Sequence, residues 1–136
     1  ENDPKHLFVI LNDPCEDKIS KRQEVILLVN FTSVREGVDY DTACVVESGS
    51  HEFITRKSYI LYREARIEQA LFVKNGLEAG DFVSKSPVSV DLYGKIVSGL
   101  FRSGFAARKY KRFFKSAYGQ GDGGRLDEEL VSEFLL

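Results

Sequence analysis

Short apolar runs alternate with polar stretches over the first half of the chain. The first two runs, LFVILN (7–12) and VILLVNFT (25–32), are almost continuously apolar. Strands that are buried on both faces, or curled into a small barrel, give this pattern, whereas half-buried strands alternate. Their β-branched and aromatic residues favour strands over helices. Further strands are predicted at TACVV (42–46), SYILY (58–62) and IEQALFV (67–73).

Polar connectors with turn-forming residues separate these runs. The connector 13–24 begins with Asp-Pro and is long for a hairpin loop, which is typical of functional or mobile loops. The segment ESGS (47–50) predicts a turn that delivers His51 to the next strand. Turns are also predicted at residues 75–76 and 79–81.

The pattern changes to helical spacing after the last predicted strand. Ser86 followed by Pro87 is a helix-start signal, because serine caps helices and proline fits the first helical position. Ser103-Gly104 predicts the end of this helix, and a second helix is expected over 105–117. The apolar residues at helical spacing in the first helix are Tyr93, Ile96, Val97, Leu100 and Phe101.

The last part of the chain has a different composition. GQGDGG (119–124) predicts a flexible linker, and a short acidic helix is expected over 127–136. Because strands come first and helices last, the order predicts a mainly β or α+β fold. We therefore expect three parts: a small β-barrel over residues 1–85, a basic helical appendage of the same domain over 86–118, and the linker with its acidic C-terminal helix over 119–136.

Composition narrows the class of protein. The length of 136 residues is typical of one domain. No apolar run approaches the ~20 residues of a membrane span, and the polar start ENDP does not resemble a signal peptide. Cys15 and Cys44 form no metal-binding pattern, so we interpret them as reduced thiols, with Cys44 buried. We expect a cytoplasmic protein without a membrane segment, metal or cofactor.

Charge is distributed unevenly, although the net charge is only −2. Residues 92–121 contain no acidic side chain, and aromatic residues such as Tyr110 and Phe113 are interleaved with the basic ones. Such a stretch can follow a phosphate backbone and stack on bases. An ordinary solvated helix face is the alternative. The residues predicted to contact RNA are Lys5, Arg102, Arg108, Lys109, Lys111, Arg112 and Lys115.

Three polar side chains, His6, Thr32 and His51, lie at the ends of predicted strands. RNA cleavage without a metal requires a base for the 2′-hydroxyl, an acid for the leaving oxygen and donors for the phosphate. Histidine suits both proton roles because its unperturbed pKa is ~6.5. Lys57 and Ser58, near His51, are further candidate donors. Two unrelated surface histidines and a structural threonine are the alternative.

The segments HLFVILND (6–13), ILLVNFTS (26–33) and SHEFITRKSYILYREAR (50–66), in this order, resemble the PemK/MazF-like toxin family. The resemblance covers roughly residues 5–70. It implies a small SH3-like barrel, usually dimeric, that acts as a metal-independent, sequence-selective endoribonuclease and is held in check by a cognate antitoxin. Thr32 matches the Thr or Ser that ends the family's second strand and serves catalysis.

One position departs from the family pattern. Where the family has an Arg-Pro pair before its first core strand, this chain has His6-Leu7. Either His6 takes over as acid or base, or this branch has lost or changed the reaction. The resemblance leads us to expect His51 as base and His6 as acid, or the reverse, with Thr32 and Lys57 holding the phosphate. RNA, a cognate antitoxin and a second copy of the chain are the expected partners.

Two other functions remain open. In the first, the barrel is a non-catalytic module that recognises RNA, DNA or a protein through its groove. In the second, the basic helix binds an acidic protein and the histidines have no role. RNA binding without cleavage favours the first, and salt-insensitive binding to a protein favours the second.

Overall fold

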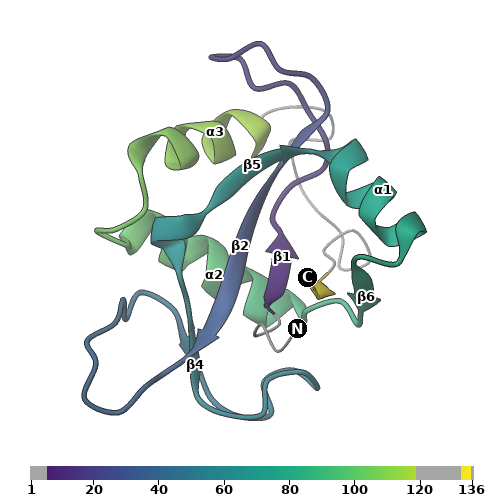
Figure 1. Ribbon diagram of the computed structural model, residues 1–136. Coiled ribbons are helices and arrows are strands. Elements are labelled where there is room, and N and C mark those ends of the chain that lie inside the picture. Colours follow the sequence, from purple (N-terminus) through teal and green to yellow (C-terminus); the bar gives the residue numbers. More distant parts are fainter. Residues whose placement is uncertain (1–5, 119–132, 136) are drawn as a thin grey trace.

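The computed structural model describes residues 6–118 and 133–135 (Figure 1). The fold is mixed α+β, with one antiparallel sheet and three α-helices in these ranges, as the sequence predicted at the level of fold class. The strands are β1 (Leu7–Ile10), β2 (Val25–Ser33), β3 (Val45–Val46), β4 (Ser58–Ile60), β5 (Arg66–Gln69), β6 (Val83–Lys85) and β7 (Glu133–Leu135). The helices are η1 (Tyr62–Glu64, a 3₁₀ turn), α1 (Ala70–Ala79), α2 (Val90–Arg102) and α3 (Arg108–Tyr118).

The long strand β2 is the centre of the sheet. It pairs with β1 through Leu28–Phe31, with β4 through its last three residues and with β5 through Val25–Leu28. The order is β3-β4-β2-β1-β7-β6, so the end strands β3 and β6 are not paired with each other. The described strands therefore form an open sheet, and the expected closed barrel is wrong for them. The end strands have two and three residues, which is too short to continue the ladder around.

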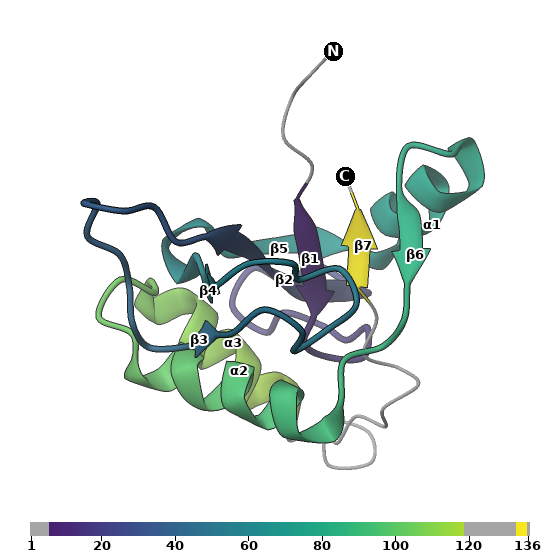
Figure 2. The ribbon, with the colours of Figure 1, turned by 90° about the horizontal axis from the view of Figure 1, so that it is seen from below.

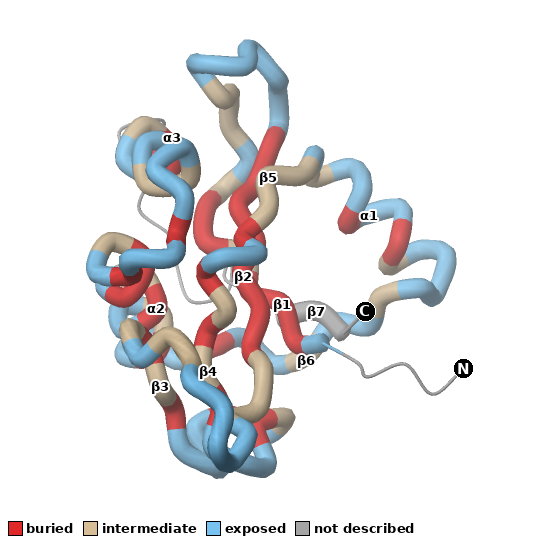
Figure 3. The backbone as a smooth tube through the Cα atoms, turned by 60° about the vertical axis from the view of Figure 1, so that its left-hand side comes forward, coloured by how far each residue is buried: buried red, intermediate tan, exposed pale blue. Residues whose placement is uncertain are grey.

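Both faces of β2 are buried, which explains its continuous apolar sequence (Figure 3). Because side chains alternate along a strand, Val25, Leu27 and Val29 face one core. Ile26 and Leu28 face a second, smaller core. The prediction of strands buried on both faces is thus confirmed for β2, with helices on both sides of the sheet in place of barrel closure.

The larger core lies between the sheet and helices α2 and α3, which cover one face together (Figure 2). Helix α2 begins three residues later than the Ser86-Pro87 signal predicts, because Ser89 is the residue that caps it. The Leu92 N–H donates to the Ser89 hydroxyl over 3.0 Å. The predicted break at Ser103-Gly104 is confirmed, since α2 ends at Arg102 and α3 begins at Arg108.

Two tyrosines, the buried Tyr62 and the partly buried Tyr93, connect α2 to the rest of the fold through hydrogen bonds. The Tyr62 hydroxyl donates to the Ile96 carbonyl over 2.6 Å, and the Tyr93 hydroxyl donates to the Leu11 carbonyl over 2.8 Å. Burial raises the pKa of both phenols. Gly99 allows this close approach, because a Cβ atom there would lie 2.3 Å from the Tyr62 hydroxyl.

Helix α1 replaces part of a predicted strand. The expected strand at 67–73 holds only to Gln69, and the chain then turns into α1, where Val73 packs in the smaller core. The predicted turn at 75–76 is wrong, because these residues lie inside α1. The predicted turn at 79–81 is confirmed by Gly80, which ends the helix with a φ of 83°.

The described end of the chain belongs to the sheet. Strand β7 pairs with β1 and with β6, so the predicted acidic helix over 127–136 is wrong for Glu133–Leu135. Residues 127–132 and 136, like the predicted linker 119–124, lie outside the described residues. The predicted strand TACVV is shortened to Val45–Val46.

Candidate functional site

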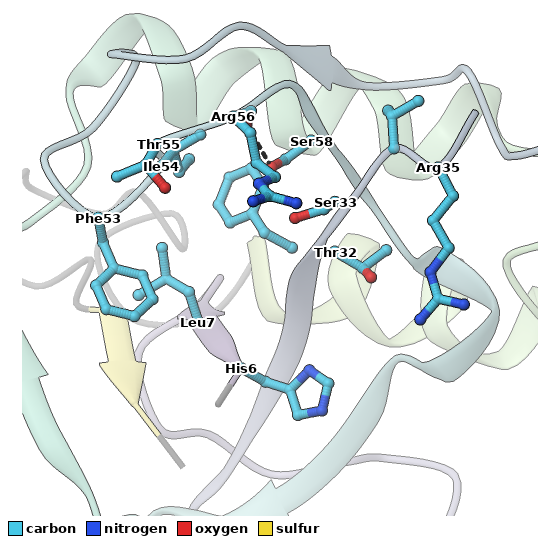
Figure 4. Close-up of a pocket in the computed structure, with 12 residues that line it drawn as sticks. His6, Leu7, Thr32, Ser33, Arg35, Phe53, Ile54, Thr55, Arg56 and Ser58 are labelled. Carbon is cyan, nitrogen blue, oxygen red and sulfur yellow. Dashed lines mark hydrogen bonds between the residues drawn. The ribbon is translucent and has the colours of Figure 1, made fainter. Parts of the chain in front are cut away.

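A cleft of about 570 Å³ lies at the end of β2 (Figure 4). Three separate segments form it: the residues that begin β1, the end of β2 with the two residues after it, and the loop that leads into β4. We call it the rim cleft. Its lining residues are His6, Leu7, Phe31, Thr32, Ser33, Val34, Arg35, Phe53, Ile54, Thr55, Arg56 and Ser58.

The polar lining of the rim cleft consists of cationic, imidazole and hydroxyl groups. Arg35 and Arg56 supply two guanidinium groups, and none of the 12 lining residues is acidic. In Figure 4 the His6 ring lies below Thr32 and the Arg35 side chain lies to its right. The Arg56 guanidinium lies toward Ser33. Guanidinium groups and hydroxyl donors that line one cleft are suited to a phosphate or another oxyanion.

The two arginines are available to a ligand. Both side chains are exposed, and neither guanidinium forms an ion pair or hydrogen bond with another residue in the described part of the chain. His6 is also exposed, with its ring 6.3 Å from the Phe8 ring in an edge-on arrangement. These three groups can therefore meet a ligand without first breaking an interaction within the described protein.

His51 lies outside this lining and is buried. Its Nε2 is 2.9 Å from the Ser86 carbonyl, and its Nδ1 accepts the Phe53 N–H over 3.0 Å. An Nδ1 that accepts a hydrogen bond leaves the proton on Nε2, which then donates to Ser86. Ser86 also donates its hydroxyl to Glu52 over 3.1 Å. The imidazole thus fastens the loop that forms one wall of the cleft, and this placement does not favour the predicted role as base.

The other predicted site residues are divided between lining and support. Thr32 lines the cleft, as does Ser58, whose buried hydroxyl donates to the Arg56 carbonyl over 2.8 Å. Lys57 is exposed and does not line the cleft, and its carbonyl accepts the Val34 N–H over 3.0 Å. The structure brings His6, Thr32 and Ser58 together, and separates His51 and Lys57 from them.

The predicted basic surface lies apart from this cleft, and part of it is structural. Arg102 donates to the Ala43 carbonyl and to Ser98, and Lys111 donates to the Ser103 carbonyl over 2.9 Å. Two further amines lie over aromatic rings, Lys109 at 5.1 Å from the centre of Tyr110 and Lys115 at 5.8 Å from the centre of Phe101. Arg108 and Arg112 are exposed, and Lys5 lies outside the described residues.

Sequence reasoning missed the two arginines of the cleft. Arg35 and Arg56 are far from each other along the chain, and neither lies in the basic stretch over residues 92–121. A signal was nevertheless present, because each lies two residues from a strand end and within two residues of a Ser or Thr. Cations and hydroxyls at neighbouring strand ends are brought together when those strands pair, as β2 and β4 do.

The thiols do not contribute to the cleft. Burial raises the pKa of both Cys15 and Cys44, which keeps them protonated and unreactive. The predicted burial of Cys44 is confirmed. Within the described residues, no group of three or more His, Cys, Asp or Glu side chains is placed to hold a metal ion.

Comparison with known proteins found no matching family model, no similar curated protein and no similar solved structure. In the part of the chain that the structure describes, no helix is both long enough and apolar enough to cross a membrane.

Proposed function

We propose that the protein binds single-stranded RNA and holds its phosphodiester backbone in the rim cleft. The observation that carries the proposal is that Arg35, Arg56 and several hydroxyl groups line one cleft, which no acidic residue lines. Hydrogen bonds from a guanidinium to a phosphate are roughly twice as strong as those between neutral groups. The chain carries a net charge of −2, so this local arrangement provides attraction that the overall charge does not.

The resemblance to PemK/MazF-like toxins supports RNA as the polyanion. Two of its three matching segments, residues 26–33 and 50–66, provide most of the cleft lining. The homodimer, the cognate antitoxin and the toxin role stay predictions from that resemblance, and the cytoplasmic location stays a prediction from composition.

Cleavage of the bound strand is the second part of the proposal. Attack by the 2′-oxygen forms a bond to phosphorus while the bond to the 5′-oxygen breaks, leaving a cyclic phosphate and a 5′-hydroxyl. A base removes the proton of the 2′-hydroxyl, and an acid supplies a proton to the 5′-oxygen. His6 is the imidazole that lines the cleft, so we assign one of these two proton roles to it. Arg35 and Arg56 stabilise the charge on the phosphorane.

Binding and cleavage are tested with one set of variants in EDTA. Arg35→Ala/Arg56→Ala should weaken binding of a labelled RNA by at least ~10-fold, because two charge-assisted hydrogen bonds are lost. The matched control is Lys18→Ala/Lys74→Ala, which removes the same charge from two exposed residues outside the cleft. Equal affinity of the two double variants would refute the cleft as the RNA site.

The assignment of His6 has its own control. His6→Ala should lower the cleavage rate by ~10²–10⁴-fold while RNA affinity changes little. His51→Ala should weaken binding and lower the melting temperature together, because it loosens the wall of the cleft. RNA that binds the wild type but is never cut would leave the non-catalytic module as the function. Cleavage that survives His6→Ala would remove His6 from the reaction.

A further inference from the structure

The rim cleft continues into a second hollow along the sheet. A small hollow of about 170 Å³ shares Thr32, Ser33 and Arg35 with the rim cleft. The same small hollow shares Tyr40 and Tyr59 with a third one of about 260 Å³. Thr32 and Tyr59 are directly opposite each other in the pairing of β2 with β4. Each hollow thus shares lining residues with the next, and we call the series of three the groove.

The chemistry of the groove changes along its length. At its far end, the rings of Tyr40 and Tyr59 lie 4.9 Å apart with an angle of 33° between their planes. Phe105, in the loop between α2 and α3, reaches the same hollow and is 58% exposed. The complete lining is Asp39, Tyr40, Asp41, Tyr59, Leu61, Arg63 and Phe105. We call this hollow the aromatic subsite.

The backbone of the exposed Phe105 is held in place by hydrogen bonds around the buried Ser103. The Ser103 hydroxyl donates to the Asp41 carboxylate over 2.6 Å and accepts the N–H groups of Phe105 and Ala106 over 3.0 and 3.2 Å. The second carboxylate oxygen of Asp41 accepts the Ala43 N–H over 2.9 Å. Asp41 therefore joins the two loops that border the subsite. A large apolar ring on a fastened loop needs little further ordering when it binds a ligand.

We propose that the aromatic subsite binds a nucleobase of the RNA strand whose phosphates lie in the rim cleft. The proposal rests on the proposed function, since it assigns the next position of the same strand. Aromatic side chains stack on unpaired bases, and an arginine plane such as that of Arg63 does the same. Stacking tolerates any base, so the subsite strengthens binding of single strands without fixing a sequence.

The acidic residues of the subsite distinguish a base from a second phosphate. Asp39 and Asp41 both line it, whereas the rim cleft has no acidic lining residue. A carboxylate repels a phosphate group, but it accepts hydrogen bonds from the N–H groups of a base edge. The groove thus offers cationic groups at one end and aromatic rings with acceptors at the other, matching the phosphate and base of a single strand.

The test uses two strands that differ only in their bases. One is 2′-O-methyl oligouridine, which lacks the attacking hydroxyl and is not cut, and the other is its abasic counterpart of equal length. Phe105→Ala should weaken binding of the oligouridine by about tenfold, the scale of one stacked base. Binding of the abasic strand should not change. The matched control is Phe72→Ala, which removes a 42% exposed ring on α1, outside the groove.

The outcomes separate the subsite from the cleft. Oligouridine affinity that Phe105→Ala leaves unchanged, or wild-type protein that binds both strands equally, overturns the subsite. If Arg35→Ala/Arg56→Ala still weakens both strands in that case, the rim cleft stands alone as the RNA site. If the wild type binds neither strand, the proposed function and the subsite fall together. A melting temperature equal to that of the wild type shows that Phe105→Ala is folded.

Discussion

The molecule has two cationic regions that differ in what their charges contact. In the helical region, Arg102 and Lys111 donate to backbone carbonyls, and Lys95 donates to the Val45 carbonyl over 2.7 Å. In the rim cleft, Arg35 and Arg56 have no such partner among the described residues. The helical region has more positive charges along the chain, but several of them are engaged within the fold, whereas both arginines of the cleft are available to a ligand.

The difference shows why a run of basic residues is a weak guide to a binding site. A carbonyl left without a partner at a strand or loop end is satisfied by whichever donor can reach it, and long cationic side chains reach furthest. Arg102 and Lys95 reach from α2 to the segment around β3 in this way. A charge that fastens one element to another is not available to a phosphate without a cost in stability.

Charge reversal gives the largest expected contrast between the two regions. Arg35→Glu/Arg56→Glu should weaken RNA binding by more than ~100-fold, because attraction becomes repulsion inside the cleft. Arg108→Glu/Arg112→Glu changes the charge equally on exposed positions of α3 and should cost only a few-fold. Affinities of both are measured by fluorescence anisotropy at one salt concentration. A larger loss for the α3 variant would reverse the comparison.

Packing of α2 gives the next largest effect, and it concerns stability. Gly99→Ala should destabilise the fold by about 2–4 kcal/mol, because its Cβ would collide with the buried Tyr62 hydroxyl. Gly94→Ala is the matched control on the same helix, since nothing lies within 4 Å of its Cβ position. It should stabilise the protein by up to ~1 kcal/mol through helix propensity. Urea unfolding measures the change in stability of each variant. Similar changes in the two variants would contradict the proposed contact between position 99 and Tyr62.

Local patterns in the sequence predicted the fold class well. The apolar run 25–32 required burial on both faces, and the structure buries β2 between two cores. The dipeptide Ser103-Gly104 marked a helix end correctly. The strand prediction failed at residues 70–73, because an apolar run such as Ala70–Val73 is compatible with a strand or with a helix. In the structure this segment is helical, and Val73 packs in the smaller core.

The candidate site was only half predictable for a different reason. His6 and Thr32 were found because each stands at the end of a strongly apolar run. His51 has a similar sequence context, but its side chain is buried and forms a hydrogen bond with the carbonyl of Ser86, a residue 35 positions away. Arg35 and Arg56 come to line one cleft through the pairing of β2 with β4, and no local sequence pattern indicates this pairing. Long-range pairing, not residue type, decides which polar groups share a site.

Removing Arg102 tests the claim that cations of the helical region stabilise the fold and do not bind RNA. Arg102→Met keeps the apolar stem and removes the donor to the Ala43 carbonyl, so it should destabilise the fold by ~1 kcal/mol. RNA affinity should fall less than twofold, because Arg102 does not line the cleft. Thermal unfolding and anisotropy measure the two effects. Normal stability together with a tenfold loss of RNA affinity would make Arg102 a ligand residue.

The last prediction concerns the pH dependence of stability that arises from Tyr62 and Tyr93, the tyrosines whose hydrogen bonds hold α2. This effect is the smallest of the series at neutral pH. Burial raises the pKa of Tyr62 and Tyr93, so the folded state keeps these protons at a pH where unfolded tyrosine, with a pKa of ~10, loses them. Their stabilising contribution is complete below that pH and is lost above it, by ~1.4 kcal/mol per pH unit for each group. In Tyr62→Phe, the free energy of unfolding should therefore fall less steeply with pH above pH ~10. If the pH dependence of unfolding is the same in Tyr62→Phe as in the wild type, burial does not raise the pKa of Tyr62 in the folded state.

The most direct measurement for the central claim is an NMR titration of the ¹⁵N-labelled protein with the uncut 2′-O-methyl oligouridine. The rim cleft as the RNA site predicts that the amides of Thr32–Arg35 and of residues 53–58 shift first and furthest. The amides of α3 should move little, and Arg35→Ala/Arg56→Ala should abolish the shifts at the cleft. Shifts that centre on α3 and leave the cleft amides in place would show that the basic helix, not the rim cleft, binds the strand.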